Sequence, residues 1–197
     1  MEKRIYILLA TFVAFYFLLK YKLNQHMNYD NEPLIFSDLI KENKEAFLAK
    51  VRVLAKKMNI NPNWLMAIMW KESKMNHRIV NSIGAVGLIQ FVPTTAGDLG
   101  TTTTQLKNMS NVDQLDYVYK YFTKYYKKTY TSYTHLYLYC FHPVAVGKPD
   151  SFIVASYPSK TYMTNKVVDA NKDGKITVAD FGKYALQEIP TRYLPYL

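Results

Sequence analysis

The sequence contains little cysteine, little glycine and few histidines. Cys140 is the single cysteine among 197 residues, which excludes an internal disulfide framework. The seven glycines form no phosphate-cradling loop, and the four histidines show no paired helical spacing suited to zinc. These absences exclude disulfide-stapled scaffolds, P-loop enzymes and histidine-based zinc sites.

Acidic residues are also scarce. Lys and Arg outnumber Asp and Glu by 25 to 15, and the isoelectric point is about 9.4. This balance favours an anionic polymer as partner: nucleic acid, a lipid head-group surface or an acidic cell wall. No stretch matches a nucleic-acid-binding motif, so a nucleic-acid binder would rest on charge alone and we expect none.

One long uncharged run is present, from Ile5 to Leu19, with basic residues on both sides. It is shorter than the roughly 20 residues of a spanning helix, but snorkelling lysines and Tyr21 extend it. Because no small-residue cleavage site follows Leu19, an uncleaved signal-anchor is favoured over a cleaved signal peptide or a buried core helix. We therefore expect residues 1–22 to anchor the chain and 23–33 to form a linker, with the rest outside the cytoplasm.

Two helices are predicted next. Ser37 is expected to open the first, whose apolar residues recur at helical spacing. Asn61-Pro62 predicts the start of the second, as an N-cap followed by proline at the first helical position. In this second helix Leu65, Ile68 and Glu72 share one face. A carboxyl group on an inward face loses water, its pKa rises, and it can hold a proton for donation as a general acid.

A short motif with two glycines follows this glutamate. After Glu72-Ser73 come Gly84-Ala85-Val86-Gly87-Leu88-Ile89-Gln90 and then Pro93-Thr94-Thr95-Ala96. The arrangement resembles the lytic transglycosylases of the goose-type lysozyme superfamily. Their signature is a helix ending in Glu-Ser, then Gly-Ala-x-Gly-Leu-Met-Gln, then Pro-x-Thr-Ala. Only Ile89 departs from it, replacing methionine.

The resemblance implies a mainly α-helical, lysozyme-like domain over residues 34–158 and an enzyme acting on peptidoglycan. Glu72 would cleave the β-1,4 bond between N-acetylmuramic acid and N-acetylglucosamine. The resemblance makes Ser73, Gly87 and Gln90 substrate-binding or orienting residues. The family also has a tyrosine near the catalytic carboxyl. The first candidate for that role is Tyr139, and the rival candidate is Tyr137.

The reaction type stays open between two chemistries. A lytic transglycosylase closes a 1,6-anhydro ring with one glutamate, whereas a hydrolytic muramidase uses water and a second carboxylate. Candidates for that second carboxylate are Asp98, Asp113, Asp116 and Asp150. The transglycosylase is favoured because no second carboxylate belongs to the signature. A catalytically silent wall-binding or assembly module is the alternative from another class, and the setting is either bacterial or phage.

Residues 169–180 form a second informative stretch. Oxygen-bearing side chains stand at loop positions one, three, five, nine and twelve, Gly174 stands at position six, and position seven would contribute a backbone carbonyl. The stretch resembles an EF-hand loop of the dockerin-like type and predicts a structural Ca²⁺ site in an EF-hand-like segment, 159–197. The predicted ligands are Asp169, Asn171, Asp173, Lys175, Thr177 and Asp180.

Overall fold

The computed structural model describes residue 16 and residues 32–124 and 130–197. The chain divides into two units, Met1–Pro33 and Leu34–Leu197, and the account below concerns the second. The predicted membrane anchor lies outside the described residues, apart from Tyr16, and stays a prediction. Within the described part of the chain, no helix is both long enough and apolar enough to cross a membrane.

The first predicted helix is shorter than expected. Ser37–Leu39 forms only a 3-10 turn, η1, after which Ile40 is extended. Helix α2 spans Lys44–Met58 and begins after Asn43, which is in the left-handed region at φ 50°. The prediction that a helix opens at Ser37 is therefore wrong. The α2 periodicity is confirmed, because α2 buries Phe47, Val51, Leu54, Ala55 and Met58.

The second predicted helix is confirmed. Helix α3 spans Pro62–Ser73, with proline at its first position. The Asn61 side chain caps it by accepting a 2.8 Å hydrogen bond from the Asn63 N–H. The chain then turns away through Lys74 and Met75, both at positive φ.

The remaining elements are short helices and two strands, so the mainly α-helical class is confirmed. In chain order they are α4 (Pro93–Asp98), α5 (Thr103–Asn108), α6 (Asn111–Lys124), α7 (Tyr133–Phe141), η2 (Pro143–Ala145), β1 (Ile153–Ser156), α8 (Lys160–Asn165), η3 (Lys166–Val168), β2 (Lys175–Thr177), α9 (Val178–Leu186) and η4 (Thr191–Tyr196). Strands β1 and β2 pair antiparallel, with Ser156 opposite Lys175.

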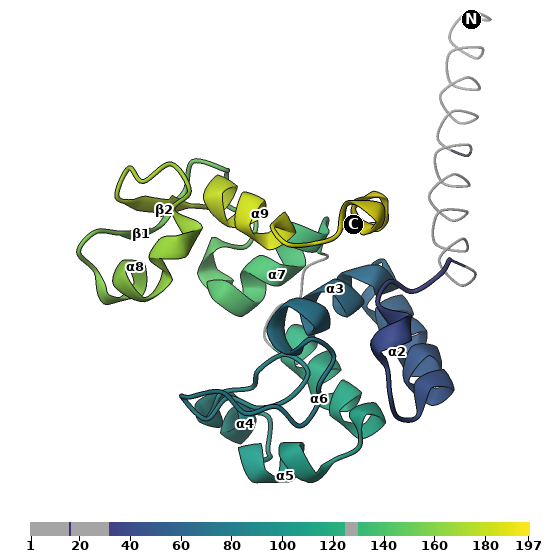
Figure 1. Ribbon diagram of the computed structural model, residues 1–197. Helices are drawn as coiled ribbons and strands as arrows, with labels where there is room; N and C mark the ends of the chain where they lie inside the picture. The colour runs from purple at the N-terminus through teal and green to yellow at the C-terminus, as the bar shows by residue number, and fades with distance from the viewer. Residues whose placement is uncertain (1–15, 17–31, 125–129) are drawn as a thin grey trace, which may run out of the picture. The chain divides into compact units, whose positions relative to one another are not determined.

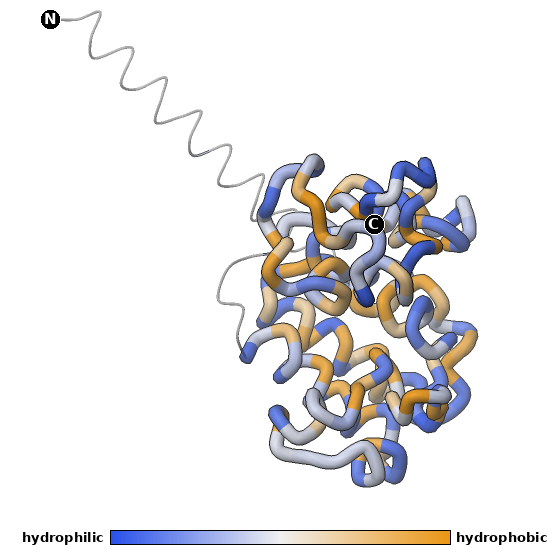
Figure 2. Tube along the Cα trace, turned by 90° about the vertical axis from the view of Figure 1, so that its left-hand side faces the viewer, coloured by the Kyte–Doolittle hydropathy of each residue, from blue (hydrophilic) through white to orange (hydrophobic). Residues whose placement is uncertain are grey.

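Helix α2 packs on α3 and α6, while α7 contacts α3 and α9 (Figure 1). Apolar and hydrophilic positions are interspersed along the chain (Figure 2). Helices α2 and α6 each bury one face, whereas α3 buries five consecutive residues, 65–69. The C-terminal end of α3 thereby lies near α7, and α7 in turn carries α9. This chain of contacts positions the candidate site.

The C-terminal segment is integrated into the same compact unit. Strand β1, before the domain boundary predicted at residue 159, pairs with β2, after it. Phe181 of α9 stacks on Phe141 of α7 with ring centroids 4.9 Å apart. The buried Tyr133 hydroxyl donates a 3.0 Å hydrogen bond to the Ala185 carbonyl. Residues 159–197 are therefore not a separate compact unit in the structure.

Candidate active site

Glu72 occupies the last turn of α3 and lines a cavity of about 170 Å³. Residues from α7, α8, η3 and α9 enclose it. The lining consists of Glu72, Tyr137, Cys140, Phe141, Asn165, Val167, Val168, Phe181 and Tyr184. Because these groups remove the carboxyl from water, burial raises the pKa of Glu72 above its ordinary value. A carboxyl in this state can carry a proton for donation.

Tyr137 is the tyrosine that contacts this carboxyl. Its hydroxyl donates a hydrogen bond to Glu72, which lowers the pKa of Glu72 and partly opposes the effect of burial. The side chain is buried, and burial followed by the charge of Glu72 raises the pKa of the Tyr137 hydroxyl, so it stays a donor.

Tyr139 lies elsewhere. Its ring packs in an aromatic cluster, with centroids 5.3 Å from Tyr121 and 6.0 Å from Tyr130. Residues two apart on a helix do not share a face, so only one of these two candidates, Tyr137 and Tyr139, can reach Glu72. Of the two candidates, the structure brings Tyr137 to the carboxyl.

Ser73 is buried beneath the site. Its hydroxyl lies 2.8 Å from the Met69 carbonyl and 3.0 Å from the Leu88 carbonyl, and it donates toward both. It does not line the cavity at Glu72. This serine therefore ties the end of α3 to the loop that carries the glycine motif.

Gly87 and Gln90 shape that loop. Both have positive φ, at 80° and 54°, and the Gln90 side-chain amide donates a 3.1 Å hydrogen bond to the Gly87 carbonyl. A Cβ at Gly87 would collide with the side-chain amide of Gln114. Glycine is needed here for its backbone conformation and for this close approach. Neither residue lines the cavity at Glu72.

Gln114 of α6 is a supporting residue that the sequence analysis did not single out. It is fully buried, and its side-chain oxygen accepts a 3.1 Å hydrogen bond from the Leu88 N–H. Its amide nitrogen donates to the carbonyls of His77 and Leu106. The sequence does contain a signal for this role: Gln114 stands four residues before Val118, on the buried stripe of an amphipathic helix.

The C-terminal residues of the lining were also missed. Phe181 and Tyr184 come from α9 and Val168 from η3, about 100 residues from Glu72 in the sequence. Cys140 of α7 lines the cavity as well. Burial, with a further contribution from Glu72, raises the pKa of its thiol well above the ordinary value. The thiol is therefore protonated and unsuited to act as a nucleophile.

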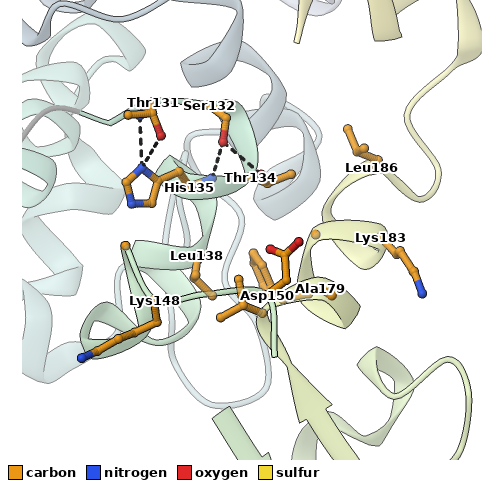
Figure 3. A pocket seen from close by; sticks show the side chains of 14 residues that line it. Thr131, Ser132, Thr134, His135, Leu138, Lys148, Asp150, Ala179, Lys183 and Leu186 are labelled. Carbon is orange, nitrogen blue, oxygen red and sulfur yellow. Dashed lines mark hydrogen bonds between the residues drawn. The ribbon is translucent and has the colours of Figure 1, made fainter. Parts of the chain in front are cut away.

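Glu72 provides the only carboxyl group among the described residues that line this cavity. Asp116 forms an ion pair of 2.8 Å with Lys50, and Asp113 caps α6 with Ser110. Asp150 lines a different cavity of about 570 Å³ between α7 and α9. There it lies near Ala179, opposite the hydroxyl groups that surround His135 (Figure 3).

The loop from Asp169 to Asp180 is held by its own hydrogen bonds. The Asp169 carboxylate accepts from the Gly174 N–H at 3.0 Å and from the Tyr162 hydroxyl at 2.7 Å, which holds its pKa below the ordinary value. The Asp180 carboxylate accepts from the N–H and hydroxyl of Thr177 in a capping box.

The oxygen-rich donor set of this loop is of the type that Ca²⁺ takes. Asp169 and Asp180 are both buried, each about 4 % exposed. However, Asp180 lies in the first turn of α9, and its carboxylate is turned back to the N-cap residue Thr177. Across the described ranges, no three His, Cys, Asp or Glu side chains gather as metal ligands would. Calcium binding therefore stays a prediction.

Comparison with known families gives one match. The family model of the transglycosylase SLT domain matches residues 50–177, a range that includes Glu72, the glycine motif and α7. The chain belongs to this family. No curated protein matches it. The SLT domain family comprises peptidoglycan lytic transglycosylases, so the protein is an enzyme of the lysozyme-like superfamily with activity of this type on peptidoglycan.

Proposed function

We propose that Glu72 is the single catalytic acid and base of this SLT enzyme. The observation that carries the proposal is a half-buried carboxyl whose pKa is raised by desolvation, in a cavity where the described lining has no second carboxylate. A group that first gives and then takes a proton works best when its pKa approaches the ambient pH. Burial and the Tyr137 hydrogen bond act on that pKa in opposite directions.

The reaction would proceed in two steps. Protonated Glu72 gives its proton to the glycosidic oxygen, and the bond to C1 of N-acetylmuramic acid breaks through an oxocarbenium-like transition state. The Glu72 carboxylate then removes the proton from the C6 hydroxyl of the same sugar. The freed oxygen attacks C1, which closes the 1,6-anhydro ring and returns Glu72 to its protonated form. The Tyr137 hydroxyl would stabilise the carboxylate between the steps.

The test is digestion of purified peptidoglycan by the full chain in detergent, followed by mass spectrometry of the products. A Glu72→Gln variant is the inactive form, and Glu188→Gln, at an exposed glutamate, is the matched control. We expect anhydromuropeptides from the wild type and the control only. Reducing-end muropeptides would make the enzyme a muramidase. No product from a folded sample would favour the wall-binding module.

We also propose that the loop from Asp169 to Asp180 takes a structural Ca²⁺, based on its donor types and spacing. Asp169 and Asp173 would be carboxylate ligands, and Asp180 would turn from its capping box toward the ion. Calcium should then raise the melting temperature of the full chain relative to chelator, and Asp173→Asn should reduce that rise. Equal melting temperatures with and without calcium would contradict the site.

We retain the proposal that residues 1–22 anchor the enzyme with its catalytic domain outside the cytoplasm, because peptidoglycan lies there. Protease added to intact cells with a permeabilised outer envelope should digest the catalytic domain. Protection of the domain until the inner membrane is broken would contradict this topology.

A further inference from the structure

A second cavity adjoins the one at Glu72. It measures about 430 Å³ and runs along η3 and the C-terminal half of α9. Three side chains, Val167, Val168 and Tyr184, line both cavities. The second cavity is therefore next to the candidate catalytic group, and Tyr184 stands at the junction.

Helix α9 is fixed to the end of α3 by the residue that precedes Glu72. The Lys71 ammonium group donates hydrogen bonds to the carbonyls of Tyr184, at 3.2 Å, and Gln187, at 2.9 Å. It also lies 4.5 Å from the centroid of the Tyr184 ring. One turn earlier on the same face of α9, the ring of Phe181 packs on that of Tyr137, with centroids 5.4 Å apart, and lies 6.2 Å from the ring of Tyr184. The placement of Tyr184 relative to Glu72 is thus set by the contacts of Lys71 and Phe181.

The chemistry of the second cavity suits a sugar ring. Tyr184 is half-buried, and the side chains of Val167 and Leu186 are 67 % and 39 % exposed. Pyranose rings have apolar C–H faces and polar edges, so an amphipathic tyrosine ring beside aliphatic groups matches them. A cavity of about 170 Å³ is below the usual 300–1,000 Å³ of ligand sites, so a polymeric glycan must extend beyond it.

We propose that the groove between η3 and α9 binds the sugar residues of the glycan strand next to the cleaved bond, with Tyr184 as a substrate-contacting residue. This inference rests on the proposed function of Glu72. The family match ends at Thr177, one residue before α9, so the groove wall formed by α9 lies outside the matched range. The C-terminal helix is then part of the substrate site and determines how well long strands are held.

The experiment compares long glycan strands, freed of peptides, with a tetrasaccharide as substrates of the full chain. Tyr184→Ala should raise KM for long strands about tenfold, equivalent to about 1.4 kcal/mol. Tyr184→Phe keeps the ring and should stay within about twofold of the wild type. A tetrasaccharide fills less of the groove than a long strand does, so Tyr184→Ala should raise its KM by a smaller factor. Tyr119→Ala, which removes another half-buried tyrosine near a lysine, is the matched control.

A second pair of variants changes two exposed side chains, which are not part of the core. Val167 and Val144 are 67 % and 68 % exposed, but only Val167 lines the groove. Val167→Arg should block it and raise KM for long strands, whereas Val144→Arg should leave KM unchanged. Equal effects of the two substitutions, or unchanged KM in both Val167→Arg and Tyr184→Ala, would overturn the proposal. Equal loss on long and short substrates would also overturn it, since that indicates a structural role.

Binding separates this proposal from the proposed function. Affinity for long strands is measured by calorimetry in the Glu72→Gln background, where no cleavage is expected. Adding Tyr184→Ala should weaken binding about tenfold, equivalent to about 1.4 kcal/mol. Residual cleavage by Glu72→Gln would contradict the catalytic role of Glu72, while unweakened binding in the double variant would contradict the groove.

Discussion

Among residues that do not line the cavity at Glu72, Gln114 is the one whose substitution should damage the site most. Its side chain holds three separate backbone groups: the Leu88 N–H in the glycine motif, the His77 carbonyl after α3, and the Leu106 carbonyl at the end of α5. Gln114→Leu keeps the approximate size of the side chain but cannot make any of these hydrogen bonds. The substitution therefore isolates the polar contribution.

The expected magnitude follows from what remains unpaired. Each buried polar group left without its partner costs about 1–3 kcal/mol. The Leu106 carbonyl keeps the Met109 N–H as a donor at 3.2 Å, so most of the cost falls on Leu88 and His77. Burial of the apolar leucine side chain offsets part of this cost. We therefore expect a net loss of about 3 kcal/mol in the free energy of unfolding.

Urea unfolding followed by the fluorescence of Trp64 and Trp70 measures this loss. Gln105→Leu provides a graded comparison, because that exposed glutamine closes the capping box of α5 and its loss should cost only about 1 kcal/mol. If Gln114→Leu destabilises no more than Gln105→Leu, the argument that this amide organises the glycine motif is refuted.

Three further predictions concern the site itself. In Gly87→Ala, a side chain is forced into the left-handed backbone region, which costs about 1–2 kcal/mol, and its Cβ collides with Gln114. The melting temperature of this variant should therefore fall clearly below that of Gly97→Ala, where the added Cβ meets open space. Tyr137→Phe removes a hydrogen bond that lowers the pKa of Glu72, so the alkaline limb of the pH–rate profile should move to higher pH; an unmoved limb would contradict the contact. Glu72→Gln should melt higher than the wild type at neutral pH. A raised folded pKa means that the wild type loses stability as pH rises through it, so this advantage should vanish in acid. A difference in melting temperature that stays constant across pH, measured by calorimetry, would contradict the raised pKa.

Helix starts that depend on local capping residues can be predicted from the sequence. The starts of α3 at Asn61-Pro62, of α4 at Pro93 and of α6 after Ser110 each depend on a few neighbouring residues. The signature residues likewise identified the family, because their order and spacing are read along the chain. Features of this kind need no knowledge of tertiary contacts.

The helix start that was predicted wrongly and the tyrosine choice that stayed open both depend on long-range contacts. The helix expected from Ser37 stops because residues 40–43 are used elsewhere: the Asn111 side chain donates to the Glu42 carbonyl and accepts from the Asn43 side chain. The choice between Tyr137 and Tyr139 depends on the rotation of α7, which the cluster around Tyr121 sets. No local pattern encodes either contact.

A proton-donating glutamate requires both kinds of information. The signature places Glu72 at the end of α3, but at that position alone it would be an ordinary helix-end carboxyl in water. Burial raises its pKa, and the groups that enclose it come from α7, α8, η3 and α9. If α9 were displaced, water would reach the cavity through Phe181 and Tyr184, and the pKa of Glu72 would fall toward its ordinary value. The C-terminal helix therefore affects both parts of the proposed chemistry, because it forms one wall of the groove for the strand and helps to raise the pKa of Glu72.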